Sequence, residues 1–201
     1  MGGIGDGVRA ANRRVSSVAA VPWPTDGLWT EAQAAIRHSL VRSEARLAPA
    51  RQQAAAIAHG LDCLAGLFDQ LAPTTCAVCL DPCCCHAKVW LDFRDLLFLH
   101  LNREPLPPHQ LRRTLHEPCR FLGRRGCRLP RRSRPWICTW YICPVQREAI
   151  ERDIPGGGVQ VDGLRAQVKS RRDAMEKAYL EVLGVSAAGW NPAASSDRTI
   201  G

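Results

Sequence analysis

Apolar residues recur at helical spacing in three parts of this chain. The clearest series lies in 51–71, where apolar positions are separated by 4, 3, 4 and 3 residues: Ile57, Leu61, Leu64, Phe68 and Leu71. Such a series forms one face of an amphipathic helix. An earlier helix is expected from Thr30 to about Leu47, because Thr30 and Gln33 have capping-box spacing and Pro49 interrupts the pattern. The two helices are predicted to form an antiparallel hairpin that packs on the rest of the chain.

The second half of the chain predicts one long helix and much irregular structure. A helix over about 162–183 has its apolar positions on one face, and Gly184 is placed to end it. Asp92 can cap a short apolar helix over 93–101. The stretch 119–144 is rich in arginine, proline and cysteine, so we expect an irregular shape there, imposed by a bound metal.

These elements predict a mainly α fold, in which a helical hairpin and a C-terminal helix surround an irregular, metal-organised, cysteine-rich core. Its 201 residues suit one domain. We assign residues 25–185 to a single helical cysteine-cluster domain, with its metal-binding core at 75–144. Residues 1–24, which hold four glycines in the first seven positions, are predicted to be a flexible arm, and 186–201 a flexible tail.

The positive charge is concentrated in one arginine-rich run. The formal net charge is +8, and residues 112–134 alone carry nine arginines against the single acid Glu117. Such a run can bind nucleic acid, form a solvated surface, or offset the negative charge of a thiolate-bound metal. We do not favour nucleic acid as the partner, because Cys119 and Cys127 are interleaved with the arginines.

Nine of the ten cysteines lie within 68 residues: Cys76, Cys79, Cys83, Cys84, Cys85, Cys119, Cys127, Cys138 and Cys143. No stretch reads as a secretory signal or a membrane span, which predicts a reducing, cytoplasmic location and no membrane partner. Clustered cysteines in that setting are more often metal ligands than disulfides. The spacing of Cys76 and Cys79 can chelate one metal from a tight turn, so the nine thiols are candidate ligands of zinc, iron or an iron–sulfur cluster. Cys63 lies outside the cluster and should be dispensable.

The cysteine pattern leaves three features of the site open. Adjacent side chains of extended backbone point to opposite faces, so Cys83, Cys84 and Cys85 cannot all easily reach one metal. Either one of the three is a bystander or the site holds more than one metal. Nine thiols exceed the four that one zinc or one cubane cluster needs, so one centre and two centres both satisfy the count. Zinc and an iron–sulfur centre both remain open.

The order of the cysteine blocks resembles a known family. The blocks are Cys76-x2-Cys79-x3-Cys83-Cys84, Pro118-Cys119-Arg120-Phe121-Leu122, Gly126-Cys127-Arg128-Leu129 and Arg134-Pro135-x2-Cys138 with a final Cys143. Over about 75–144 they look like the YkgJ-type CxxCxxCC cysteine-cluster family, which implies a zinc- or iron-chelating domain. Leu80 replaces the family's glycine, one extra residue precedes the paired cysteines, and the pair is a triplet. Flagellin lysine methylases are similar in carrying such a cluster, which implies an alternative role in modifying a protein side chain.

We therefore expect a metal-binding cysteine-cluster protein whose metal is structural or redox-active. The alternatives are an enzyme that assists protein side-chain modification and a zinc-dependent nucleic-acid binder. No paired carboxylates, serine–histidine arrangement or phosphate loop supports conventional catalysis. His86 and His116 are weaker candidates for a ligand or a base. The aromatic residues around the last cysteines, Trp136, Trp140 and Tyr141, are expected to shield the sulfurs. A metal ion is the expected partner, and the predicted helix pair suits docking of a second protein as well.

Overall fold

The computed structural model describes most of the chain, in five ranges: 21–71, 74–80, 89–114, 116–124 and 126–185. The structure is mainly helical, as predicted, with 66% helix. The helices are α1 (Asp26–Arg42), α2 (Ala48–Leu71), α4 (Phe93–Leu101), α5 (Trp136–Trp140), α6 (Pro144–Asp153) and α7 (Gly157–Leu183). Short 3-10 turns are η1 (Glu44–Arg46), η2 (Cys76–Val78) and η3 (Arg131–Ser133), and the strands are β1 (Leu122–Gly123) and β2 (Gly126–Cys127). The predicted arm and tail lie outside the described residues, apart from 21–24.

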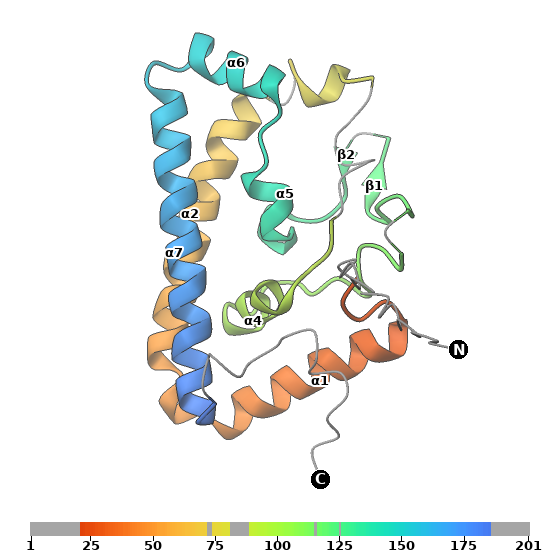
Figure 1. Ribbon diagram of the computed structural model, residues 1–201, viewed down its shortest axis with the longest axis vertical. Helices are drawn as coiled ribbons and strands as arrows, with labels where there is room; N and C mark the ends of the chain where they lie inside the picture. The colour runs from red at the N-terminus through yellow and green to blue at the C-terminus, as the bar shows by residue number, and fades with distance from the viewer. Residues whose placement is uncertain (1–20, 72–73, 81–88, 115, 125, 186–201) are drawn as a thin grey trace, which may run out of the picture.

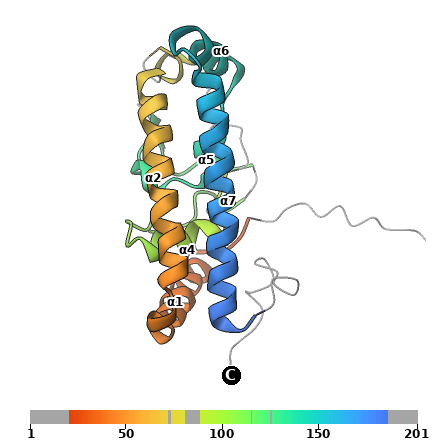
Figure 2. The ribbon, with the colours of Figure 1, turned by 90° about the vertical axis from the view of Figure 1, so that its left-hand side faces the viewer.

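Two long helices, α2 and α7, lie side by side and run in opposite directions (Figures 1 and 2). The predicted apolar face of α2 is buried along its whole length: Ile57, Leu61, Leu64, Phe68 and Leu71. On α7, Val168, Met175 and Tyr179 are buried. Full burial of such side chains contributes roughly 1.5–3 kcal/mol each. The pair therefore provides the long axis of the core.

A glycine allows the two long helices to come close together. A Cβ atom added to Gly60 of α2 would lie 2.5 Å from Cγ2 of Val168 on α7. That distance is well inside van der Waals contact, so no larger residue fits unless the Val168 side chain or one of the helices shifts. Gly66, on the same helix, has nothing within 4 Å of such a Cβ.

The hairpin predicted from the first two helices is wrong, because α2 pairs with α7 instead. Helix α1 crosses below the long pair at a wide angle and packs on α4 (Figure 1). It begins at Asp26 rather than Thr30, because the hydroxyl of Thr25 accepts a hydrogen bond from the N–H of Leu28 and so caps the helix. The indole of Trp29 is fully buried and donates to the carbonyl of Pro107 at 3.1 Å.

The packed region begins before the boundary expected from the sequence. Val21 and Trp23 are buried, and the carbonyl of Pro22 accepts a hydrogen bond from the Gln110 amide. The Gln110 side chain also bonds both the N–H and the carbonyl of Leu91, as a neighbouring strand would. Residues 21–24, which the sequence assigned to the arm, are thus part of the fold.

Helix α4 has the bounds that the sequence predicts. Asp92 caps it in a reciprocal capping box with Asp95. Most of its side chains are buried, including Leu96, Leu97 and Leu99. The helix therefore lies in the middle of the molecule, between α1 and the long pair (Figure 1).

The stretch 119–144 contains only short elements, and an additional helix follows it. Strands β1 and β2 form a two-residue antiparallel hairpin with Leu122 opposite Cys127. Helix α6 was not predicted. The first turn of α7 was not predicted either, because the sequence placed the start of this helix near Asp162, whereas it begins at Gly157. Within the described ranges, no helix is long and apolar enough to cross a membrane.

Candidate metal centre

Six of the nine candidate ligands lie within the described residues. Cys83, Cys84 and Cys85, together with His86, lie outside them. No disulfide joins two of the seven described cysteines. Cys63 lies on α2, away from the motif, with its sulfur 3.9 Å from Nε2 of His59.

The first two cysteines lie in a turn attached to the end of α2. The N–H of Cys79 bonds the carbonyl of Cys76 across η2 at 3.4 Å, and both thiols are exposed. Thr75 fixes the turn by donating its hydroxyl to the carbonyl of Leu71 at 2.8 Å. The Cys76-x2-Cys79 spacing therefore does form a tight turn that presents two sulfurs to solvent.

Gln146 of α6 connects this turn with the last cysteine. Its side-chain amide donates to the sulfur of Cys76 at 3.1 Å, across 70 positions of sequence. Its backbone N–H reaches the sulfur of Cys143 at 3.5 Å, and its side-chain oxygen accepts from the Cys143 N–H in return. Cys143 thereby caps α6, with Pro144 in its first turn. Figure 1 shows η2 beside the start of α6. One residue thus contacts one cysteine from each half of the motif.

Cys119 precedes the β hairpin, and Cys127 lies in its second strand, β2. The carbonyl of Cys119 accepts from the N–H of Leu122 at 3.1 Å, and Cys127 pairs with Leu122 across the two strands. Burial raises the pKa of the Cys119 thiol, and the neighbouring Cys127 acts in the same direction. The guanidinium of Arg112 opposes this shift. Arg112 itself is buried. Compensation of thiolate charge by the arginine run stays a prediction.

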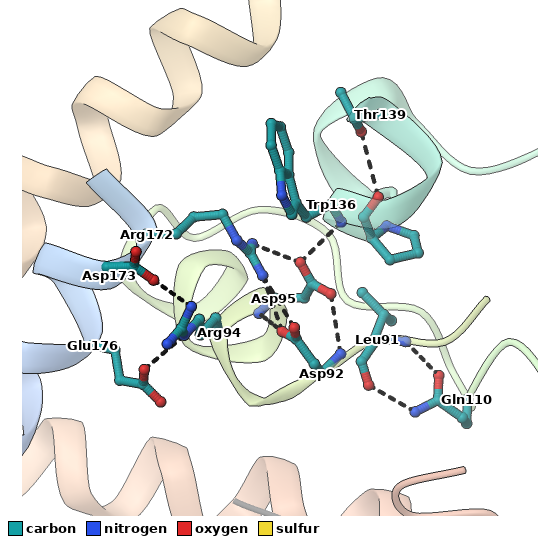
Figure 3. Close-up of polar contacts among 11 residues, drawn as sticks. Leu91, Asp92, Arg94, Asp95, Gln110, Trp136, Thr139, Arg172, Asp173 and Glu176 are labelled. Atoms are coloured by element: carbon teal, nitrogen blue, oxygen red, sulfur yellow. Dashed lines mark hydrogen bonds and ion pairs between the residues drawn. The ribbon is translucent and has the colours of Figure 1, made fainter. Parts of the chain in front are cut away.

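Cys138 lies on α5, a helix of five residues held by a buried ion-pair network (Figure 3). Asp95 of α4 accepts from the first N–H of α5, that of Trp136, at 3.0 Å, and from Arg172 of α7 at 2.7 Å. Arg172 also bonds Asp92 at 3.1 Å and lies over the Trp136 ring, 5.9 Å from its centre. The network joins α4, α5 and α7, and so fixes the segment that carries Cys138.

The central ion pair of this network is almost fully buried. The side chains of Arg172 and Asp95 are only 5% and 6% exposed. Complete burial raises the pKa of Asp95 to about 7, while the Arg172 guanidinium and two backbone N–H donors pull it down. On the solvent side, Arg94 pairs with Asp173 and Glu176 of α7 (Figure 3). The network was not predicted from the sequence, although Arg172 interrupts the apolar face between Val168 and Met175.

Other arginines of the run bind carboxylates of the helical body. Arg131 pairs with Asp69 of α2, and Arg132 pairs with Asp62 at 2.5 Å. Arg132 also reaches Glu104 at 3.0 Å. These bonds attach η3 to α2. Part of the positive charge therefore serves to dock one segment on another, which none of the explanations drawn from the sequence included.

The aromatic residues near the last cysteines contact arginines of α7. Arg165 lies over the ring of Trp140 at 5.3 Å, as Arg172 does over Trp136. Trp140 packs edge-on against Tyr141, which is 45% exposed. Cation–π contacts of this kind help to hold α5 against the long helix. Shielding of sulfurs by these rings stays a prediction.

Convergence of all the cysteines into one site also stays a prediction. The structure connects Cys76 with Cys143, and Cys119 with Cys127. Among the described residues, no three histidine, cysteine, aspartate or glutamate side chains form a group that could hold a metal ion. His116 is exposed.

Comparison with known proteins adds no assignment. No family model matches the chain, and neither a curated protein nor a solved structure matches it. The likeness to the cysteine-cluster family therefore rests on the cysteine blocks quoted above.

Proposed function

We propose that this chain is a metal-binding cysteine-cluster protein that holds zinc or an iron–sulfur centre through its clustered thiolates. The observation that carries the proposal is the contact of Gln146 with the sulfurs of both Cys76 and Cys143. One polar side chain thus forms hydrogen bonds to two cysteines from opposite halves of the motif. Unrelated buried thiols would not need such an arrangement.

The donor chemistry fits these metals. Thiolates are the usual ligands of structural zinc and of iron–sulfur clusters. Amide N–H groups that point at a ligating sulfur stabilise its negative charge, and Gln146 supplies such groups to Cys76 and Cys143. A bound zinc would supply a cross-link between the two segments, whereas an iron–sulfur centre would supply electron transfer.

Metal analysis of protein purified without oxygen tests the proposal. Wild-type protein should contain zinc, or iron with sulfide and a brown colour, in stoichiometric amount. The pairs C76S/C79S and C119S/C127S should each lose most of the metal, because each removes two ligands. C63S is the matched control and should keep the full content. Wild-type protein that is metal-free, and that takes up neither metal at micromolar concentration, would refute the proposal.

A second variant isolates the contribution of Gln146. Q146A leaves every thiol in place and removes the side-chain bonds to the Cys76 sulfur and to the Cys143 N–H, while the backbone N–H of residue 146 still reaches the Cys143 sulfur. Loss of such an outer-shell partner weakens metal binding by about 10–100-fold. Competition with a chelator measures this change, and metal affinity equal to that of the wild type would show that the Gln146 contacts only cap α6.

A further inference from the structure

A hollow lies beside the β hairpin, and the proposed metal chemistry does not use it. It has a volume of about 490 Å³ and is lined by His109, Arg120, Phe121, Arg128 and Leu129. Phe121 directly precedes β1 and Arg128 directly follows β2, so two lining residues come from the base of the hairpin. Figure 1 shows where the hairpin lies in the fold. Sites for small molecules in proteins commonly have volumes of about 300–1,000 Å³.

One part of the hollow is aromatic and apolar. The rings of His109 and Phe121 lie with their centres 5.0 Å apart and their planes at 37°. Leu129 is buried beside them. Gln110, whose amide is bonded to three backbone segments, fixes the position of His109 in the chain. Such a surface suits the face of a planar ring.

The other part is cationic and has unused donors. Nη1 of Arg120 is buried and makes no hydrogen bond to a described residue. It forms an ion pair with Asp26 at 3.6 Å, and that carboxylate is 62% exposed. Arg128 donates one bond, from Nη2 to the carbonyl of Arg120 at 2.7 Å, and forms no ion pair with a described carboxylate. Two guanidinium groups therefore face this hollow with donors to spare.

We propose that the hollow binds a small planar organic anion, an aromatic ring that bears a carboxylate or a phosphate group. The ring would lie against His109 and Phe121, and the anionic group would accept from Arg120 and Arg128. The planar fork of arginine matches both oxyanions. This site goes beyond metal binding, because none of its lining residues is a proposed ligand.

Calorimetric titration of the full, metal-replete chain with benzoate and with phenyl phosphate tests the site. At least one of the two should bind saturably, and the stronger one identifies the preferred oxyanion. Inorganic phosphate and benzyl alcohol each carry one half of the recognised chemistry and should bind about tenfold more weakly or not at all. Failure of both aromatic anions to bind, or equal binding of inorganic phosphate, would overturn the proposal.

Variants locate the site. R120Q/R128Q should weaken binding of the preferred anion at least about tenfold, since two charge-assisted contacts are lost. R124Q removes one positive charge from the exposed hairpin turn, outside the hollow, and should bind like the wild type. NMR of wild-type protein provides a reading that needs no variant: the signals of the His109 ring and the Arg120 and Arg128 side chains should shift on titration. Shifts confined to other residues, or equal losses in R124Q and R120Q/R128Q, would contradict the assignment.

Discussion

At the scale of single residues, His100 of α4 makes stability depend on pH. Its Nε2 is buried and has no hydrogen-bond partner among the described residues. Burial lowers the pKa of His100 below its usual 6.5, and the nearby Arg37 adds to the shift. The unfolded chain therefore takes up a proton at a higher pH than the folded one. The contribution of the neutral His100 side chain to the free energy of unfolding is complete above pH 6.5 and is lost as the pH falls.

H100Q should flatten this dependence. Between pH 7 and 5 the free energy of unfolding of the wild type should fall more steeply than that of H100Q, by at most about 1.4 kcal/mol per pH unit. Urea unfolding at a series of pH values measures both curves. H38Q replaces an exposed histidine and controls for the change of side chain. Parallel curves for H100Q and wild type would show that His100 is not responsible.

At the scale of elements, the contact of α5 with α7 depends on the pair Arg172 and Asp95. R172L leaves the Asp95 carboxyl buried without its cation. Breaking a buried pair in this way costs about 3–5 kcal/mol. Chemical unfolding at pH 8 measures this loss, and R171L on the exposed side of α7 is the matched control.

The pH dependence of the R172L deficit identifies its cause. Burial holds the folded-state pKa of Asp95 above its unfolded value, and loss of Arg172 raises it further. A raised pKa favours the folded state at low pH, so the deficit of R172L should shrink between pH 8 and pH 5. A deficit that is constant with pH would point to lost packing of the arginine stem instead.

The approach of α2 to α7 is tested by two glycines of the same helix. G60A places a methyl group 2.5 Å from Val168 and should destabilise the protein by about 1–3 kcal/mol. G66A meets open space and should stabilise it by about 0.5–1 kcal/mol, because alanine favours the helix. Thermal unfolding compares the two. Equal effects of the two substitutions would mean that the helices can separate at Gly60 without cost.

Local signals predicted the elements, and non-local ones were missed. Helix α4 follows from Asp92 and the apolar run behind it, because both the cap and the burial are set within ten residues. The partner of α2 was predicted wrongly, because the sequence pattern of the apolar face of α2 is compatible with packing against α1 and against α7. The close fit of Val168 against Gly60, which lie 108 positions apart, is one of the non-local contacts that favour α7. The cap made by Cys143 was missed since cysteine is not a usual N-cap residue.

At the scale of the whole molecule, metal removal should loosen the cysteine segments and leave the helical body intact. The β hairpin has only two residues per strand, and η2 is a single turn. Helix α5 is held by a hydrogen bond to Asp95 of α4 and by cation–π contacts with α7, and η3 has ion pairs to α2. Arg124, in the hairpin turn, is already exposed. Chelation should loosen this turn and so speed its cleavage by trypsin, while most of the helical circular dichroism remains.

The control for this experiment is C119S/C127S, which should be cut at the same place before chelation and show little further change after it. An apo protein that resists trypsin as well as the metal-loaded one would show that residues 75–144 fold without metal. The cysteine cluster would then be an addition to a self-sufficient fold.

The pairing of α2 with α7 also has a consequence during synthesis. The apolar face of α2 is complete when Leu71 leaves the ribosome, yet its partner begins 86 residues later, at Gly157. At about 5–20 residues per second, that face waits on the order of 10 s for its cover. A nascent chain halted before α7 should thus be retained by chaperones or aggregate. Synthesis of α7 is therefore needed before the first half of the protein can reach its folded state.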